Sequence, residues 1–435
     1  MTRACRLVMF LVLGLPPTVA AGQTGDGHIH LRDRLTDLFR FGTCGKPLCL
    51  DNSVNATNGH GDHFLPDLAA NNGAMINFLN NAISATASNF PLAASGSGVT
   101  YKFVDGLPVK TSTSLGPIFG ERAQTIGKGR FVVGTNLTGI SFTSLRGVPL
   151  EGLILTFTHD NVAPDVYGQP LRENDILQVG LDLNINLLVS TFFATYGLTD
   201  KVDVGVAVPL VRSSLSGRSI GQFLPFGIPT SHFFAGDSAS PVLTASAATF
   251  GSATGFGDIA VRAKANLVDR ERFRLAFMAD ARLPSGSAEE LTGSGHFALR
   301  TLAIASGRFA EFSPHLNVGF AIRGGSGLND AVLATAGFDQ IVSSWATLAV
   351  DVISEWETGA IALTMPSSVT FESPVERTVR LSNIPAKRDH RVNAAFGFRF
   401  RTPGGPILTT NALVPLRQGG LQAAFIWTAG VDLSF

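Results

Sequence analysis

Charged residues are scarce in this chain of 435 residues, where they make up only 15% of the total. Soluble domains usually carry closer to a quarter, so the composition does not suit an ordinary soluble protein. The 33 basic and 33 acidic residues also cancel, which leaves no excess of positive charge for binding nucleic acid. We therefore expect no nucleic-acid partner.

Long apolar runs are missing as well, since no stretch approaches the 18 or so residues of a transmembrane helix. The one compact run, Leu7–Leu15, follows Arg3 and Arg6 and precedes the small residues Val19–Ala21. This order is typical of a secretory signal peptide, predicted for residues 1–21. The alternative of a membrane anchor is disfavoured because the run is about half the necessary length. An exported hydrophobic chain without a membrane helix is either a soluble periplasmic protein or a barrel.

Cysteine is rare too. Cys5 lies in the predicted signal peptide, which leaves Cys44 and Cys49. Two cysteines in an exported chain favour a disulfide, and its short loop predicts a stabilisation of only about 2 kcal/mol. The alternatives are two reduced thiols, or a metal site with nearby histidines whose spacing fits no standard zinc pattern: His28, His30, His60 and His63. We expect no metal and no cofactor.

What the sequence does have, from residue 130 onward, is an alternation of apolar and polar residues with a period of two. In the stretch 258–267, for example, Val261 and Ala263 alternate with Arg262 and Lys264, as in a half-buried strand. Most such segments exceed the five or six residues of a globular strand and suit a tilted membrane strand of about 9–11. They lie near 130–142, 176–196, 201–212, 256–267, 272–283, 296–306, 312–323, 331–341, 345–355, 390–401, 406–416 and 423–435.

Short and long connections between these segments alternate, apart from two short Gly-rich links at 324–330 and 417–422. Bacterial barrels have short periplasmic turns, longer external loops and an even strand count. We therefore predict an all-β fold, a transmembrane antiparallel β-barrel in the bacterial outer membrane, surrounded by its lipid. It should have about twelve strands, with fourteen as the alternative, and both chain ends in the periplasm. The long links, all expected to be external loops, are 143–175, 213–255, 284–295 and 356–389.

Energetics predict which face meets lipid. A Lys or Arg facing lipid near the midplane would cost roughly 2–4 kcal/mol, so the apolar set should face outward and the charged set inward. A structural ladder of paired charges is favoured over a selectivity ring. The predicted lumen-facing charges are Asp182, Asp203, Asp258, Arg262, Lys264, Arg274, Asp280, Arg282, Arg300, Asp339, Asp351, Glu355, Arg399, Arg401 and Asp432.

The last predicted strand ends on an aromatic residue, with apolar residues at every second position before it. This pattern resembles the signal read by the outer-membrane barrel assembly machinery, which is an expected partner. The predicted signal residues are Val431, Leu433 and Phe435.

Residues 22–129 show little period-two pattern. Short helices are expected within 31–41 and 72–87, and a hairpin around Asp105-Gly106, since Asp-Gly favours a tight turn. Apolar residues such as Phe78 and Leu79 favour a packed plug in the lumen over a periplasmic domain or a disordered leader. The predicted barrel domain then spans 130–435.

Several turn and strand motifs resemble one family. They include Tyr196–Pro209 (YGLTDKVDVGVAVP), Gly255–Ile259 (GFGDI), Arg282–Gly286 (RLPSG) and Gly116–Phe119 (GPIF). Over roughly 115–435 the chain is similar to the MetA-pathway of phenol degradation family, distantly related to the long-chain fatty-acid outer-membrane transporters. The resemblance implies an N-terminal plug and the uptake of small hydrophobic or aromatic compounds. A non-specific porin-like or structural barrel is the alternative.

Catalytic motifs are missing. There is no Gly-x-Ser-x-Gly nucleophile motif and no phosphate-binding loop, so we expect no enzyme, with an outer-membrane hydrolase as a remote alternative. His159 and His232 are expected to be solvated in external loops. His296 and His315 are expected to join a lumen network.

Overall fold

The computed structural model describes residues 29–41, 66–89, 101–104, 107–110, 114–159, 161, 166–168, 173–226, 232–325, 328–364 and 368–435. The predicted signal peptide at 1–21 and the two cysteines Cys44 and Cys49 lie outside these ranges, so the predicted disulfide stays a prediction.

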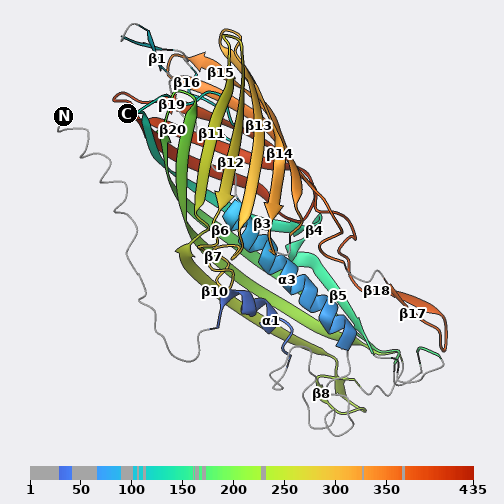
Figure 1. Ribbon diagram of the computed structural model, residues 1–435. Helices are drawn as coiled ribbons and strands as arrows, with labels where there is room; N and C mark the ends of the chain where they lie inside the picture. The colour runs from blue at the N-terminus through green and yellow to red at the C-terminus, as the bar shows by residue number, and fades with distance from the viewer. Residues whose placement is uncertain are drawn as a thin grey trace.

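Twelve antiparallel strands close into a barrel, which confirms the predicted fold class (Figure 1). Each strand pairs with the next, and the last pairs with the first to complete the ring. Each predicted segment contains or overlaps one of them. The strands are β3 (Phe131–Leu145), β6 (Ile176–Gly197), β7 (Val202–Leu224), β11 (Ala260–Asp269), β12 (Phe273–Arg282), β13 (Ala298–Gly307), β14 (Phe312–Arg323), β15 (Ala331–Ser343), β16 (Ala346–Glu357), β19 (Arg391–Arg401), β20 (Ile407–Arg417) and β21 (Leu421–Ser434).

The two ends of the barrel differ. One end, here called the turn end, carries the short links between successive strands and the paired ends Phe131 and Phe435, which exchange backbone hydrogen bonds of 3.2 and 2.8 Å. The other, the loop end, carries the longer connections, including the hairpin of β17 (Ser368–Phe371) and β18 (Arg377–Arg380). Among the described helices, none has the length and apolar character needed to cross a membrane.

The outer surface of the barrel is an apolar band between two rows of exposed aromatic side chains. The 11 positions from Trp345 to Trp356 correspond to roughly 28 Å of height at a strand tilt of about 40°. Outer-membrane barrels have such a band, about 25 Å tall and flanked by aromatic girdles. The protein is therefore a bacterial outer-membrane barrel. The turn-end row is Phe131, Tyr196, Phe273, Phe309, Phe312, Trp345 and Phe435, and the loop-end row is Phe256, Phe297, Trp356 and Phe425.

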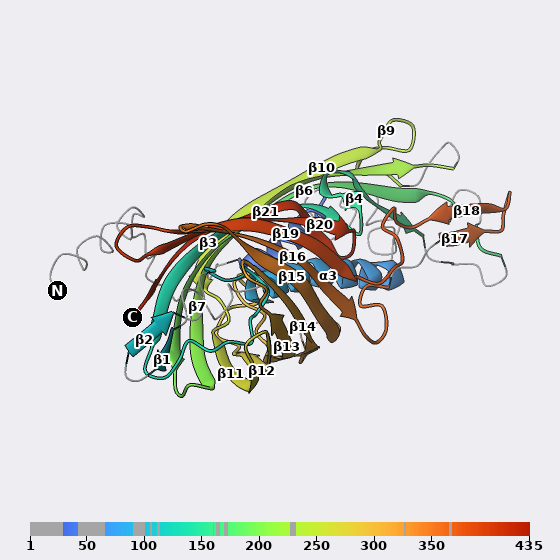
Figure 2. The same cartoon turned by 90° about the horizontal axis from the view of Figure 1, so that it is seen from above.

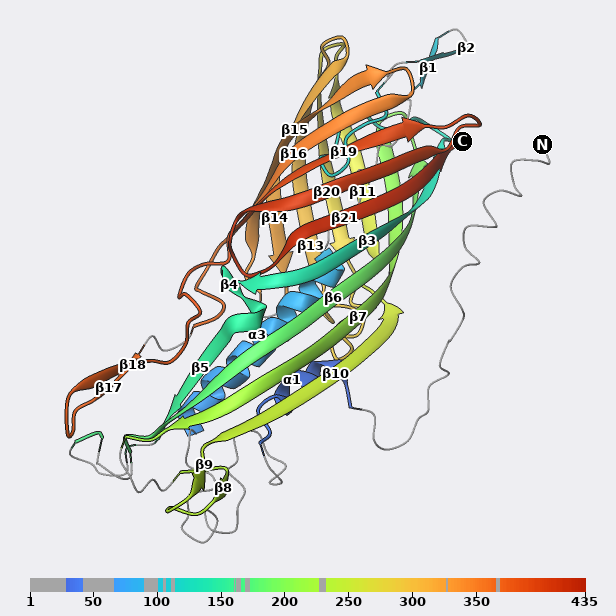
Figure 3. The same ribbon diagram turned by 180° about the vertical axis from the view of Figure 1, so that it is seen from behind.

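Strands β6 and β7 continue well beyond the barrel at its loop end. There β5 (Leu153–Thr158) pairs with β6, and β10 (Thr244–Phe256) pairs with β7, so that a four-stranded sheet extends from the barrel wall (Figure 3). The prediction that 213–255 is a loop is wrong for most of its length, because the last half of β7 and all but one residue of β10 lie within it. Short elements complete this end: β4 (Val148–Pro149), η3 (Leu150–Gly152), β8 (Ala235–Gly236) and β9 (Pro241–Val242).

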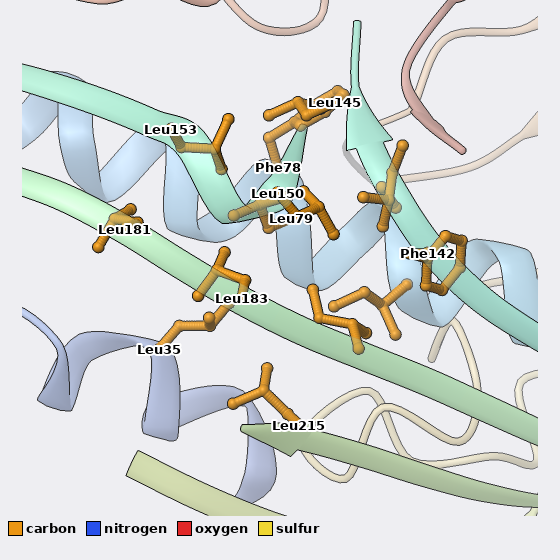
Figure 4. Close-up of a cluster of buried hydrophobic side chains, with 14 of the residues drawn as sticks. Leu35, Phe78, Leu79, Phe142, Leu145, Leu150, Leu153, Leu181, Leu183 and Leu215 are labelled. Atoms are coloured by element: carbon orange, nitrogen blue, oxygen red, sulfur yellow. The ribbon is translucent and has the colours of Figure 1, made fainter. Parts of the chain in front are cut away.

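The inner face of this extension is covered by the N-terminal part of the chain. Helix α3 (Pro66–Asn89), the turn η2 (Leu31–Asp33) and the short α1 (Arg34–Asp37) lie against it. Figure 4 shows Leu35 of α1 beside Leu183 of β6 and Leu79 of α3 beside Leu150, and these residues form one cluster with Leu181 and Leu215 of the strands. All six side chains are at most 3% exposed, so they form a hydrophobic core like that of a soluble protein.

The prediction that Asp182 faces the lumen is wrong. Its neighbours Leu181 and Leu183 point into the core, so Asp182 projects to the outside with Asn184, and both are exposed. The reason is a change of solvent along one strand. Toward the turn end, the exposed side chains Leu188 and Phe192 belong to the apolar band. Beyond that band the outer surface faces water, so polar residues point out and apolar residues point in.

The β1–β2 hairpin lies beyond the turn end of the barrel, far from α3 (Figure 2). Strands β1 (Tyr101–Val104) and β2 (Leu107–Lys110) pair antiparallel around the Asp-Gly pair. The elements within 22–129 are thus divided between the two ends of the barrel.

Replacing Leu183 by alanine should destabilise the loop-end core. Loss of a fully buried leucine costs about 2–5 kcal/mol in the free energy of unfolding, whereas Asn184→Ala on the water-facing side should cost less than about 0.5 kcal/mol. Urea unfolding of the purified protein, followed by tryptophan fluorescence, measures both. Equal effects would contradict the assignment of the two faces.

An ionic contact fastens the first described residues to the connection between β12 and β13. The His30 Nδ1 atom lies 2.8 Å from a Glu290 carboxylate oxygen, and His30 Nε2 lies 3.3 Å from Glu289. The hydrogen bond to Glu290, helped by the charges of Glu289 and Asp33, raises the pKa of His30 above its ordinary value of 6.5. The backbone N–H of Arg32 also donates to the carbonyl of Glu289.

This contact should make stability depend on pH. Because the pKa of His30 is raised on folding, its contribution is complete below the unfolded pKa of about 6.5 and is lost as pH rises through the folded value. Wild type should therefore exceed His30→Gln in urea stability at pH 5.5, and the difference should vanish at pH 9. A difference that is constant with pH would contradict the ionic assignment.

Candidate functional site

The turn-end half of the barrel is crossed by residues Ser114–Ile126, here called the lumen segment. It contains no helix or strand, so its backbone groups cannot satisfy one another. Instead it bonds to inward-pointing side chains from seven strands, β7, β11, β13, β14, β15, β16 and β19. Buried backbone N–H and C=O groups are nearly always paired, and here the barrel wall supplies the partners.

Carboxylate and amide side chains hold the backbone of this segment. Asp351 accepts hydrogen bonds from the N–H groups of Phe119 (3.3 Å) and Gly120 (3.2 Å). Asn317 accepts from the N–H of Glu121 (2.7 Å) and donates to its carbonyl (2.9 Å). This two-way contact is the kind that a neighbouring strand would make.

Further contacts continue to the end of the segment. Asn266 donates to the Ala123 carbonyl at 2.8 Å, and Asp203 accepts from the Ile126 N–H at 3.1 and 3.2 Å. The segment is thereby fixed along its whole length.

Two charged side chains of the segment are paired with the wall. The Nε atom of Arg122 donates to Asp339 at 3.0 Å, and its Nη2 contacts the other oxygen of the same carboxylate. The hydroxyl of Ser114 donates to Asp339 as well. Arg122 and Asp339 are both buried, so removing one would leave the other uncompensated, which typically costs 3–5 kcal/mol.

The second charge, Glu121, lies between two cations of β11. Its carboxylate is 3.3 Å from Arg262 Nη1 and 3.7 Å from Lys264 Nζ. Lys264 Nζ is also 3.8 Å from Asp203, so positive and negative groups alternate across the lumen.

Gly120 allows the closest approach of the segment to the wall. A Cβ atom at this position would collide with the His315 ring, and the His315 Nε2 atom is held 2.6 Å from Asp351. No residue with a side chain fits there unless His315 moves.

Other predicted charges pair within the wall. Asp280 accepts from Arg262 Nε at 2.7 Å and from Arg282 Nε at 2.8 Å. Arg399 donates to Asp432 at 2.7 Å and to the Pro117 carbonyl of the lumen segment at 3.1 Å.

Some predicted residues lie elsewhere. Asp258 sits at the loop-end rim, where it accepts from the N–H groups of Gly286 and Ser294 and so fixes the β12–β13 connection. Arg274 pairs with the exposed Asp269 at the turn end. Arg401 is partly buried on β19. Arg300 and Glu355 lie nearer the loop end of the barrel than the lumen segment does, and there they line a cavity.

This cavity, of about 140 Å³, lies on the loop-end side of the lumen segment. Phe119 of the segment borders it on one side, and Ala85 and Thr86 at the end of α3 border it on another. Its apolar wall consists of Phe142, Leu302, Leu328, Leu333, Ile353, Leu413, Leu421, Ala423 and Ile426, and its charged residues are Arg300, Arg323, Glu355 and Arg391.

Three of the histidine expectations are wrong. His159 and His232 are buried rather than solvated, with their rings 5.3 Å apart, and His232 Nδ1 lies 2.9 Å from Asp175. His296 is exposed at the loop end instead of joining the lumen. His315 points into the lumen beside Asp351. Across the described ranges, no three His, Cys, Asp or Glu side chains are placed to hold a metal ion.

The predicted assembly signal lies at the turn end of β21. Val431 and Leu433 alternate with the buried Asp432, and Phe435 is 69% exposed. These three side chains therefore share the outer face, and their role in assembly stays a prediction.

Residues 173–340 match the family model described as putative MetA-pathway of phenol degradation. The match confirms the resemblance carried by Tyr196–Pro209 and the motifs of the following strands. No curated protein matches the sequence.

Three solved structures are similar in part. An outer membrane channel from Pseudomonas putida F1 has a TM-score of 0.42 and 12% identity, over 72% of this chain and 98% of that chain. The P. putida toluene transporter TodX has a TM-score of 0.31 and 10% identity, over 71% of this chain and 89% of that chain. A Pseudomonas aeruginosa FadL homologue has a TM-score of 0.29 and 12% identity, over 70% of this chain and 89% of that chain.

Replacing Arg122 by glutamine should loosen the lumen segment, because Asp339 keeps a buried charge without its partner. We expect a loss of about 3–5 kcal/mol in the free energy of unfolding, together with a higher conductance in planar bilayers. The control is Arg274→Gln, whose partner Asp269 is half exposed and whose loss should cost less than about 1 kcal/mol. Unchanged conductance in Arg122→Gln would contradict the prediction that this ion pair holds the lumen segment in place across the barrel.

Proposed function

We propose that this protein is an outer-membrane channel for the uptake of small hydrophobic or aromatic compounds, and that its N-terminal part, residues 22–129, plugs it by means of the lumen segment. The loop end then faces the exterior and the turn end the periplasm. The observation that carries the proposal is the cavity directly behind the lumen segment, where apolar side chains such as Phe119, Leu302 and Ile353 line it together with polar and charged ones. A compound that arrives from the loop end would stop there until the segment shifts.

The lumen segment is suited to such a shift. Its bonds run to side chains and not to a continuous backbone ladder. The neutral bonds, to Asn317 and Asn266, contribute only about 0.5–1.5 kcal/mol net each, and those to carboxylates about 1.5–3 kcal/mol. Contacts of this kind can be exchanged one at a time. The inward charges fit the role of a ladder that holds the segment, since Asp203, Asp339 and Asp351 all contact it.

The filled lumen also bears on selectivity. A segment bonded to seven strands narrows the lumen at the turn end, so transport should favour compounds that bind the cavity over sugars. The barrel assembly machinery is the proposed partner that reads the Val431, Leu433 and Phe435 face.

Deleting the protein from its native bacterium tests this function. Growth on a single-ring aromatic as sole carbon source should slow, while growth on a sugar should not change. The intact chain should restore growth on the aromatic compound.

A variant lacking residues 29–126 should, if it still assembles, admit sugars into proteoliposomes that the intact chain excludes. Equal passage of sugars through the intact chain would instead indicate a non-specific porin.

A further inference from the structure

Among the charged residues that line the cavity, positive charges outnumber negative ones. Arg300 on β13, Arg323 on β14 and Arg391 on β19 face it, together with one acid, Glu355 on β16. Three positive charges against one negative charge leave two positive charges uncompensated. The lining is therefore not merely apolar, as uptake of hydrocarbons alone would require.

The single acid is already engaged. Glu355 lies 2.7 Å from Arg323 Nη2 and 4.0 Å from Arg391 Nη1. It therefore compensates Arg323 most directly and Arg391 partly, which leaves Arg300.

Arg300 has no hydrogen-bond or ion-pair partner among the described residues. Its nearest acid on the same face is Asp280, directly opposite on β12. Asp280, however, accepts from the Nε atoms of Arg262 and Arg282. Asp280 is thus shared among three arginines, and Arg300 attracts Asp280 and Glu355 without a direct hydrogen bond to either. Its planar donors therefore remain available to bind a ligand.

The apolar side begins one step nearer the turn end. Leu302 follows Arg300 by two positions, so both project from the same face of β13. On β16, Ile353 likewise lies two positions nearer the turn end than Glu355 and on the same face. Phe119 of the lumen segment also lines the cavity on its turn-end side. A ligand in this cavity would meet positive charge from β13, β14 and β19 and, beside it, an apolar wall that includes Leu302 and Ile353.

The volume limits the size of that ligand. A cavity of about 150 Å³ lined by apolar side chains holds benzene, and this one measures about 140 Å³. It therefore suits one aromatic ring and is too small for a long acyl chain.

We infer that the cavity binds a single-ring aromatic compound that carries an anionic group such as a carboxylate. This inference rests on the proposed function and names its substrate class. The ring packs against Phe119, Leu302 and Ile353, and the carboxylate binds the guanidinium of Arg300. Arginine suits this role because its planar donors match the two oxygens of a carboxylate.

Calorimetric titration of the purified full-length protein in detergent tests the inference. The probes are benzoate and benzyl alcohol, which share a ring and differ in charge at neutral pH. Benzoate should bind more tightly by about tenfold or more, the value of a hydrogen bond to a charged group. Arg300→Gln should remove this advantage and leave benzyl alcohol unchanged.

Two further variants serve as controls. Arg270→Gln, at an exposed turn position, should leave the affinity for both ligands unchanged. Arg300→Lys keeps the charge but loses the planar donors, so it should retain part of the preference even if the glutamine variant fails to fold.

Equal affinity for the two ligands in the wild type would overturn the inference and leave the channel proposal intact. Binding of neither ligand would also overturn it, and the growth experiment then decides the channel proposal separately.

Discussion

The lumen segment is held by side chains that take the place of a partner strand. Asp351, Asn317 and Asn266 bond its backbone, and Arg122 closes on Asp339. Without these contacts, a stretch with no regular structure would leave its N–H and C=O groups buried and unpaired. The site depends on them, because the same segment places Phe119 at the cavity and Gly120 against His315.

The barrel strands were predictable because two different solvents act on their two faces. Charged residues such as Arg262 cannot face the apolar band at low cost, so alternation survives in the sequence and marks each strand. The loop-end sheet was missed for the same reason. In β6 the apolar phase changes at Leu187 and Leu188, the first buried in the core and the second exposed in the band. Reading one phase along the whole strand put Asp182 on the wrong face.

Of the site residues, only those on the strands of the barrel wall could be predicted from the sequence. The inward position of Asp203, Asp339 and Asp351 followed from their strands, whereas Glu121 and Arg122 lie in a stretch with no periodicity. Their one signal is an adjacent acid and base in a segment otherwise free of charge, which required charged partners somewhere in the barrel. The cavity itself could not be anticipated, because closure of the ring brings its residues together from β3, β13 and β19.

The loop-end core has a consequence for the order of folding. Leu35 and Leu79 are buried against Leu183 and Leu215, which follow them by more than a hundred positions in the chain. Contacts of such high sequence separation form slowly, because the entropy of closing the loop is lost before the contact stabilises anything. Helix α3 thus has no apolar surface to pack on until β6 and β7 are paired. The part of the chain that is synthesised early is among the last to reach its native surroundings.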